Sequence, residues 1–306
     1  MTFRSSAIPG AAAATTRPST IRSGGFYLGQ RVLSEAGFLL FGVVILIWTL
    51  LPLYHMVMLS LTPLSDSFAG RFWPESPTLE NYRIVFTEDH FFLQDFWRQL
   101  WNSIFVALAT MVMVLVVASL ASFAIGRLKL RYGHVISNTA LLTYLIPAAF
   151  VAIPFYVVMS DYGLINTLWA LVFAMSTFAI PYAIWVLRQY GDSVPFELDE
   201  AAKVDGATPL QIFYLVYIPL LRPALIAIGT YALLLAWNEY LYAFLLLSSE
   251  KQATIPVAMG YFLVTDDAPW TLLMATAIIY SLPPAALYYA VRKYMVSGLT
   301  AGATKT

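Results

Sequence analysis

The sequence contains no cysteine and very little charge. The absence of cysteine excludes disulfides, thiolate zinc sites, iron–sulfur clusters and cysteine nucleophiles. Only 11% of the 306 residues are charged, whereas a soluble domain carries about 25%. The 17 basic and 17 acidic residues cancel, so the chain has no net attraction for nucleic acid. With 60% hydrophobic residues and a mean hydropathy of +0.73, the composition is typical of a membrane protein with several spans.

Six apolar runs are long enough to cross a bilayer as helices. Crossing about 30 Å of hydrocarbon at about 1.5 Å per residue takes about 20 residues. The runs of this length are residues 38–59, 103–126, 135–159, 166–187, 224–247 and 270–291. Four of them contain prolines that are expected to kink or interrupt them, namely Pro52, Pro147, Pro154, Pro181, Pro283 and Pro284. The sequence therefore predicts an all-α polytopic membrane protein with six transmembrane helices.

The distribution of Lys and Arg predicts the orientation of these spans. An even number of spans places both termini on one side, and the loops and tails of that side carry 13 basic residues against four on the other. Basic residues near span ends are retained in the cytoplasm. We therefore expect both termini and residues 188–223 in the cytoplasm, and loops 60–102 and 248–269 outside.

The domain organisation is predicted from the same pattern. Residues 1–35 are expected to form a disordered cytoplasmic tail, because the first 30 are rich in Ser, Thr, Ala, Gly and Arg and contain no acid. Residues 36–295 are expected to form the transmembrane domain, which includes a polar segment at 193–221. Residues 296–306 are expected to form a cytoplasmic C-terminal tail.

The polar segment between the fourth and fifth runs is predicted to form two short helices and a turn. The first helix begins with acids and ends with a base, an order that the helix dipole favours. These residues are Glu197, Asp199, Glu200 and Lys203. Gly206 can adopt the left-handed conformation that ends a helix. Thr208, Pro209 and Gln211 match a capping box with proline at the first helical position.

The same segment contains a spaced motif. It consists of Glu200-Ala201-Ala202, then Gly206, then Val216, Ile218 and Pro219. The spacing resembles the EAA motif of ATP-binding-cassette importer permeases, which is Glu-Ala-Ala, three residues, Gly, nine residues and Ile-x-Leu-Pro. Val and Ile stand here for the usual Ile and Leu. The resemblance implies ATPase coupling by Glu200, Ala201, Ala202, Asp205, Gly206, Ala207 and Pro219.

Further matches extend over roughly residues 36–304. They are Pro77-Thr-Leu-Glu-Asn-Tyr, Asn102-Ser, Gly163-Leu-Ile-Asn-Thr, Trp237-Asn-Glu-Tyr and Gly298-Leu-Thr-Ala-Gly-Ala. Together they are similar to sugar-importer permeases of the maltose-transporter G type. The resemblance implies a non-enzymatic transport subunit in the bacterial cytoplasmic (inner) membrane, and it leaves the sugar open.

The resemblance also implies which partners this subunit has. They are a second, non-identical permease, two copies of a cytoplasmic ATPase, and a periplasmic or lipid-anchored sugar-binding protein. ATP and Mg²⁺ would be bound by the ATPase, because this chain has no Gly-x-x-x-x-Gly-Lys loop. No cofactor or nucleic acid is expected on this chain itself.

Two further groups of residues are candidates for roles in transport. Glu239 is the only acid within an apolar run, and its exposure to lipid would cost about 2.5–3.5 kcal/mol. With Asn238 it is either a pathway or gate residue or a hydrogen-bonded contact between helices. The resemblance implies that loop 248–269 contacts a docked binding protein. The candidate contact residues there are Thr254, Ile255, Pro256 and Tyr261.

Two other classes of function compete with the importer permease. An ion-coupled secondary carrier for a small polar solute usually has internal repeats and several intramembrane charges, whereas these runs contain one acid. An intramembrane enzyme needs a nucleophile and a base, or metal ligands, within its spans. The lone His55 and the absence of cysteine offer neither, and no metal site is predicted.

Overall fold

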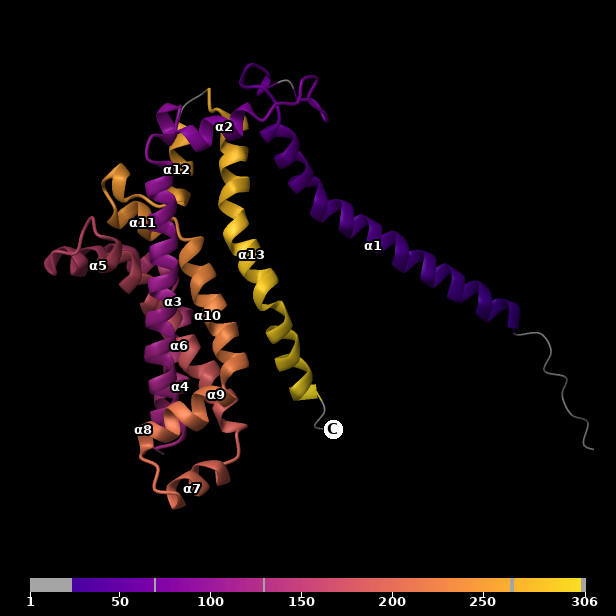
Figure 1. The fold of residues 1–306 in the computed structure, drawn as a ribbon. Coiled ribbons are helices and arrows are strands. Elements are labelled where there is room, and N and C mark those ends of the chain that lie inside the picture. Colours follow the sequence, from indigo (N-terminus) through magenta and orange to yellow (C-terminus); the bar gives the residue numbers. More distant parts are fainter. Residues whose placement is uncertain (1–23, 69, 129, 265–266, 304–306) are drawn as a thin grey trace, which may run out of the picture. The chain divides into compact units, whose positions relative to one another are not determined.

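The computed structural model describes residues 24–68, 70–128, 130–264 and 267–303. Its regular elements within these residues are all helices (Figure 1), as the composition predicts. The chain divides into two compact units, residues 1–54 and 55–306.

Helix α1 (Gly24–Ser60) supplies most of the first unit and contains the candidate span Glu35–Ser60. It begins within the tail that was expected to be disordered, so residues 24–35 are helical and that expectation is wrong for them. The physical reason is that a helix, once nucleated, lengthens by one hydrogen bond per residue. The expectation for residues 1–23 lies outside the described residues.

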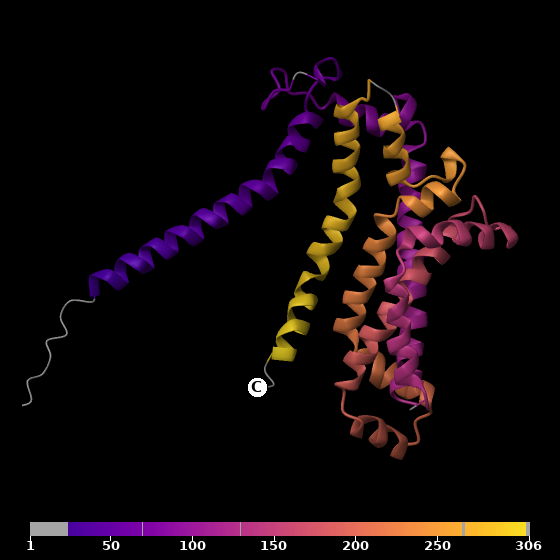
Figure 2. The same ribbon diagram turned by 180° about the vertical axis from the view of Figure 1, so that it is seen from behind.

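The second unit is built on four long helices that run side by side (Figures 1 and 2). They are α3 (Phe96–Gly126), α6 (Leu168–Asp192), α10 (Arg222–Trp237) and α13 (Trp270–Ala303). Helix α3 packs along α6 and α10, and α13 packs against α10. Helix α13 continues eight residues into the predicted C-terminal tail, 296–306, while residues 304–306 lie outside the described part.

Shorter helices precede α3 or connect these four. They are η1 (Leu64–Asp66), α2 (Glu80–Thr87), η2 (Phe91–Leu93), α4 (Gly133–Leu141), η3 (Leu142–Leu145), α5 (Ala148–Asp161), α7 (Glu197–Val204), α8 (Pro209–Ile212), the π-helical turn η4 (Phe213–Tyr217), α9 (Ile218–Leu220), α11 (Leu241–Leu246), η5 (Glu250–Gln252), α12 (Ile255–Tyr261) and η6 (Phe262–Val264). Figure 1 places α7 at one end of the bundle and α2 and α12 at the other. Two apolar clusters fill the interior, one including Leu272 and Tyr242, and the other including Leu187 and Tyr217.

Two predicted spans differ from straight helices. The run 135–159 is broken, because α4–η3 and α5 meet at 102°. Ile146 is extended at the break, with φ −89° and ψ 115°, and this is the conformation that a following proline imposes. Pro147 thus interrupts its run as expected, whereas the other five prolines lie inside helices that continue through them.

The run 224–247 is also divided. Helix α10 ends at Trp237, and three residues separate it from α11. Its other end meets the stretch Pro209–Leu220 at 80°. Four described helices are long and apolar enough to span a membrane, and the number reaches six if each bent pair counts as one span.

Polar residues from the matched motifs connect the elements at the α2 end. The Asn81 Nδ2 donates to the Ser60 and Thr62 carbonyls at 2.8 and 2.7 Å. Asn166 has a left-handed backbone, with φ +60°, and its side-chain oxygen accepts from the Ser249 N–H at 3.1 Å. Asparagine tolerates this conformation better than most residues. These motifs therefore fix the loops of one end of the bundle.

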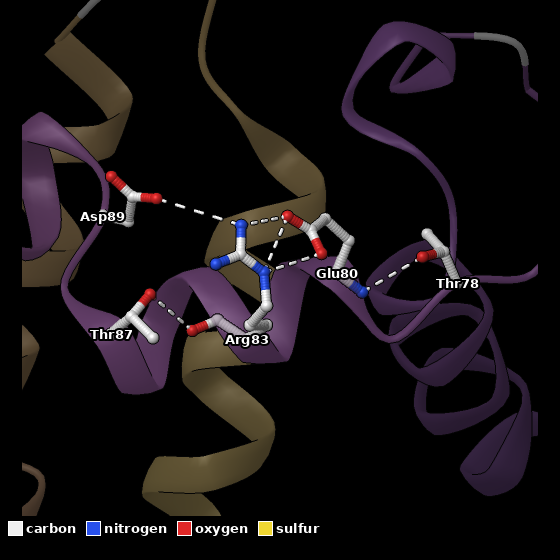
Figure 3. Close-up of polar contacts among 5 residues, drawn as sticks. All are labelled: Thr78, Glu80, Arg83, Thr87 and Asp89. Atoms are coloured by element: carbon white, nitrogen blue, oxygen red, sulfur yellow. Dashed lines mark hydrogen bonds and ion pairs between the residues drawn. The ribbon is translucent and has the colours of Figure 1, made fainter.

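Exposed charges on α2 form local pairs, as Figure 3 shows. The Arg83 Nε donates to both Glu80 carboxylate oxygens at 3.0 and 2.9 Å, and its Nη2 lies 3.9 Å from Asp89. The Thr78 hydroxyl accepts from the Glu80 N–H, and the Thr87 hydroxyl donates to the Arg83 carbonyl. Because the pairs are exposed, they contribute little to stability.

Candidate functional site

The predicted turn between two short helices is present at the end of the bundle that carries α7. Gly206 has φ +82°, as its left-handed role requires. The Ala207 N–H donates to the Ala202 carbonyl at 2.9 Å, and the Gly206 N–H donates to the Lys203 carbonyl at 3.0 Å. This pair of bonds is the Schellman motif that ends a helix at a glycine. The end of α7 is therefore specified by local hydrogen bonds.

The start of α8 is specified equally well. The Gln211 N–H donates to the Thr208 hydroxyl at 3.3 Å, and the Gln211 side-chain oxygen accepts from the Thr208 N–H at 2.7 Å. These reciprocal bonds are the predicted capping box, and Pro209 occupies the first helical position. The connection between α6 and α10 thus contains two short helices joined by a turn that local hydrogen bonds define.

Aromatic side chains anchor the second half of the segment in the bundle. Phe213 and Tyr217 lie on the π-helical turn that follows α8, and both are buried. Their rings lie 5.2 Å from the ring of Phe123 on α3, at edge-to-face angles of 64°. Such pairs contribute about 0.5–1.5 kcal/mol beyond their area of contact. Pro219, the last residue of the motif, is half-buried in α9.

A buried ion pair holds the first half of the segment. The Arg127 Nη1 at the end of α3 lies 3.3 Å from the Asp199 Oδ2 on α7, and these side chains are only 2% and 6% exposed. The Arg127 Nη2 donates to the carbonyls of Gly191 and Val194 at 3.2 and 2.9 Å. Its guanidinium lies 4.5 Å from the centre of the Phe196 ring. One arginine thus connects α3, the end of α6 and α7.

The outer surface of the segment is open. Glu200, Ala201, Asp205 and Gly206 are exposed. The apolar side chain of Val204 is 88% exposed. Ala202 and Ala207 are half-buried and pack on the apolar cluster beneath. Of the two motif alanines, Ala201 is the one on the open surface of α7.

The predicted contact loop at the opposite end is attached firmly to α3. The Asn102 Nδ2 donates to the carbonyls of Lys251 and Ala253, both at 2.9 Å. The Ser103 hydroxyl accepts from the Ile255 N–H at 3.0 Å. Thr254 and Ile255 are 3% and 0% exposed, so the contact role predicted for these two residues is wrong. Helical packing against α3 buries them.

The remaining two candidates of this loop are accessible. Pro256 and Tyr261 are half-buried. Tyr261 lines a cavity of about 260 Å³ together with Phe91, Phe92 and the acid Glu250. Burial and the nearby Glu250 carboxylate raise the pKa of Tyr261, so its hydroxyl stays protonated at neutral pH.

Asn238 and Glu239 lie at the break between α10 and α11. The Glu239 carboxylate accepts from the Tyr242 N–H at 2.7 Å, and the Asn238 amide donates to the Leu234 carbonyl at 2.8 Å. Both bonds are within the segment, and neither joins two distant helices. Asn238 is exposed and Glu239 is half-buried. A pathway or gate role for these residues stays a prediction.

The sequence reasoning missed the partnership of Arg127 and Asp199. Arg127 counted only as a basic residue near a span end, and Asp199 only as an acid in the first turn of a helix. They are 72 positions apart, so no local pattern links them. A basic residue closing an apolar run and an unexplained acid beside the spaced motif are the only available signals.

Comparisons with known proteins agree with this geometry. Residues 118–300 match the family described as binding-protein-dependent transport system inner membrane component. The chain is 31% identical over 278 residues to the inner membrane ABC transporter permease protein YcjP of Escherichia coli (strain K12), with coverage of 90% of this chain and 98% of that protein. It is 33% identical over 260 residues to the trehalose transport system permease protein SugB of Mycobacterium tuberculosis (strain CDC 1551 / Oshkosh), with coverage of 84% and 93%.

A solved structure shares the fold. It is the crystal structure of a bacterial ABC transporter involved in the import of the acidic polysaccharide alginate. One chain of it matches with a TM-score of 0.74 and 25% identity, covering 87% of this chain and 97% of that chain.

Proposed function

Because this chain belongs to the family of binding-protein-dependent transport system inner membrane components, we propose that it is the permease subunit of an ATP-binding-cassette importer that takes up a sugar. Family membership confirms the resemblance inferred from the EAA motif. Trehalose and alginate, named for two of its relatives, are both carbohydrates. We propose a mono- or oligosaccharide as the solute of this chain's transporter.

The observation that carries this proposal is the rigid segment at the α7 end of the bundle. Two capped helices, a left-handed glycine turn and a buried ion pair hold it against α3 and α6. A rigid segment can transmit a rigid-body movement, whereas a disordered loop would absorb it. Its exposed Ala201 and Val204 offer a small, apolar contact to a second protein.

We infer the partners from the exposed α7 segment and from the family. Separate cytoplasmic ATPase subunits bind ATP and Mg²⁺ and dock on α7 and α8, and a second permease completes the transmembrane pathway. A sugar-binding protein docks at the opposite end, near Tyr261. A pathway or gate role for Asn238 and Glu239 is part of this proposal, and their position at the break between α10 and α11 supports it. The termini are in the cytoplasm, on the side favoured by the 13 basic residues.

Site-directed cross-linking tests the docking surface. The chain has no cysteine, so Ala201→Cys introduces a unique thiol on α7. A thiol-to-amine cross-linker applied to native membranes should join this variant to an ATPase subunit. Lys251→Cys is the control, because it places an exposed thiol beside Asn102 at the start of α3, the opposite end from α7. Equal cross-linking of an ATPase by both variants, or none by Ala201→Cys, would contradict the proposed surface.

A further inference from the structure

The ion pair between Arg127 and Asp199 has features that simple folding does not require. The two side chains are almost completely buried, although they lie at the end of the helical bundle. Removing two charges from water costs several kcal/mol per ion, and well-packed apolar residues would often be at least as stable. The pair is therefore poorly explained as a source of stability. A geometric role explains it better.

The geometry points to Arg127 as the positioning residue of the polar segment 193–221, called here the coupling segment. We propose that Arg127, Asp199 and the carbonyls of Gly191 and Val194 form a clamp, called here the Arg127 clamp, which makes α7 move as one body with α3 and α6. This inference rests on the proposed function, because it assigns the route by which a push on α7 reaches the transmembrane helices.

The donor geometry of arginine suits this role. A planar guanidinium holds its N–H groups in fixed directions, and here Nη2 donates to both carbonyls while Nη1 forms the ion pair with the Asp199 carboxylate. The contacts come from two helices and their connection: Asp199 lies on α7, Gly191 near the end of α6, and Val194 between them. The ring of Phe196 covers the guanidinium face. Tilting α7 away from α6 would separate Asp199 from the guanidinium, which the two carbonyl bonds hold at the end of α6.

Close packing beside the clamp limits the same movement. A Cβ added at Gly191 would lie 2.5 Å from the Tyr217 hydroxyl, so the end of α6 touches the buried ring. The Tyr217 hydroxyl donates to the Ser122 hydroxyl on α3 at 3.3 Å. Both halves of the coupling segment are thus attached to α3 and α6, the first through Asp199 and the second through Tyr217.

Asp199→Asn is the direct test, because it removes the charge and keeps the shape. Spin labels at Gln189→Cys on α6 and Lys203→Cys on α7, both exposed positions, report the placement of α7 in the purified transporter in lipid nanodiscs. The wild-type distance distribution should be narrow, and Asp199→Asn should broaden it. The ratio of sugar transported to ATP hydrolysed should fall roughly tenfold or more, while hydrolysis continues. A purely structural role would lower the amount of transporter and leave this ratio unchanged.

Two further variants make the test decisive. Glu197→Gln is the matched control, because it neutralises an exposed acid on the same helix and should leave both readouts at wild-type values. Arg127→Lys keeps a cation beside Asp199 but loses the fork, and it should give an intermediate distribution and ratio. If Asp199→Asn does not accumulate in membranes, the label distances and the transport ratio of Arg127→Lys test the clamp instead.

The two ways of failing are distinguishable. Unchanged label distances and an unchanged transport ratio in Asp199→Asn and Arg127→Lys would overturn the Arg127 clamp and leave the importer intact. Wild-type uptake that does not depend on ATP would overturn the proposed function, and with it the coupling role of the clamp.

Discussion

Replacement of Gly206 tests the coupling segment most sharply among single substitutions. The residue has φ +82°, and a Cβ added there would meet no atom within 4 Å. The cost of Gly206→Leu therefore comes from the backbone, and a left-handed conformation costs a residue other than glycine about 1–2 kcal/mol. A cost of this size changes the population of the turn by a factor of about 5–30. We expect ATP-driven uptake per assembled transporter to fall by at least this factor.

Two matched variants separate the turn from general instability. Gly163→Leu imposes the same strain, because Gly163 has φ +66° and equally open surroundings but precedes α6 at the other end of the bundle. Gly206→Asn keeps a residue that tolerates the left-handed conformation. Uptake in proteoliposomes, divided by ATP hydrolysed, should fall for Gly206→Leu only. Wild-type coupling by Gly206→Leu, or an equal loss in Gly163→Leu, would refute the reasoning.

Three further predictions concern packing, loop attachment and pH. Gly191→Ala should lower the free energy of unfolding of the purified protein by about 1–3 kcal/mol, because the added Cβ would collide with Tyr217. A Cβ at Gly126 has its nearest neighbour at 3.6 Å, so Gly126→Ala should change the free energy of unfolding little. Asn102→Ala leaves the Lys251 and Ala253 carbonyls without their donor. The substitution should lower the free energy of unfolding by about 1–3 kcal/mol and speed proteolysis of loop 248–269. An unchanged cleavage rate would contradict the attachment of this loop to α3. Burial lowers the pKa of His90, whose Nδ1 accepts from a backbone N–H. The contribution of His90 to stability is therefore complete above its ordinary pKa of about 6.5 and is lost as the pH falls below that value. His90→Gln should weaken the dependence of the melting temperature on pH between about pH 7 and 5, and a dependence equal to that of the wild type would contradict this assignment.

Features governed by local chemistry could be predicted from the sequence. The turn at Gly206 and the capping box at Thr208 and Gln211 depend on residues within a few positions of one another, and the structure contains both. The break before Pro147 follows from proline geometry in the same way. Hydropathy, in contrast, measures only the length of an apolar run. It could not predict the 102° bend in the third run or the end of α10 at Trp237.

Features that depend on contacts between distant segments could not be predicted. Arg127 and Asp199 meet only because α3 and α6 pack side by side and α7 folds back beneath them. The burial of Thr254 and Ile255 likewise depends on polar contacts from Asn102 and its neighbour, which precede them by about 150 positions. The motif match identified the family of the chain correctly. The contacts that these residues make could be seen only in the folded structure.

Affinity purification of the tagged chain from its native membrane, with identification of what accompanies it by mass spectrometry, tests the central claim most directly. We predict a second multi-span permease and an ATPase with a Gly-x-x-x-x-Gly-Lys loop, and the recovered complex should transport sugar only with ATP. A homogeneous assembly of this chain alone, with uptake driven by an ion gradient and indifferent to ATP, would contradict the account.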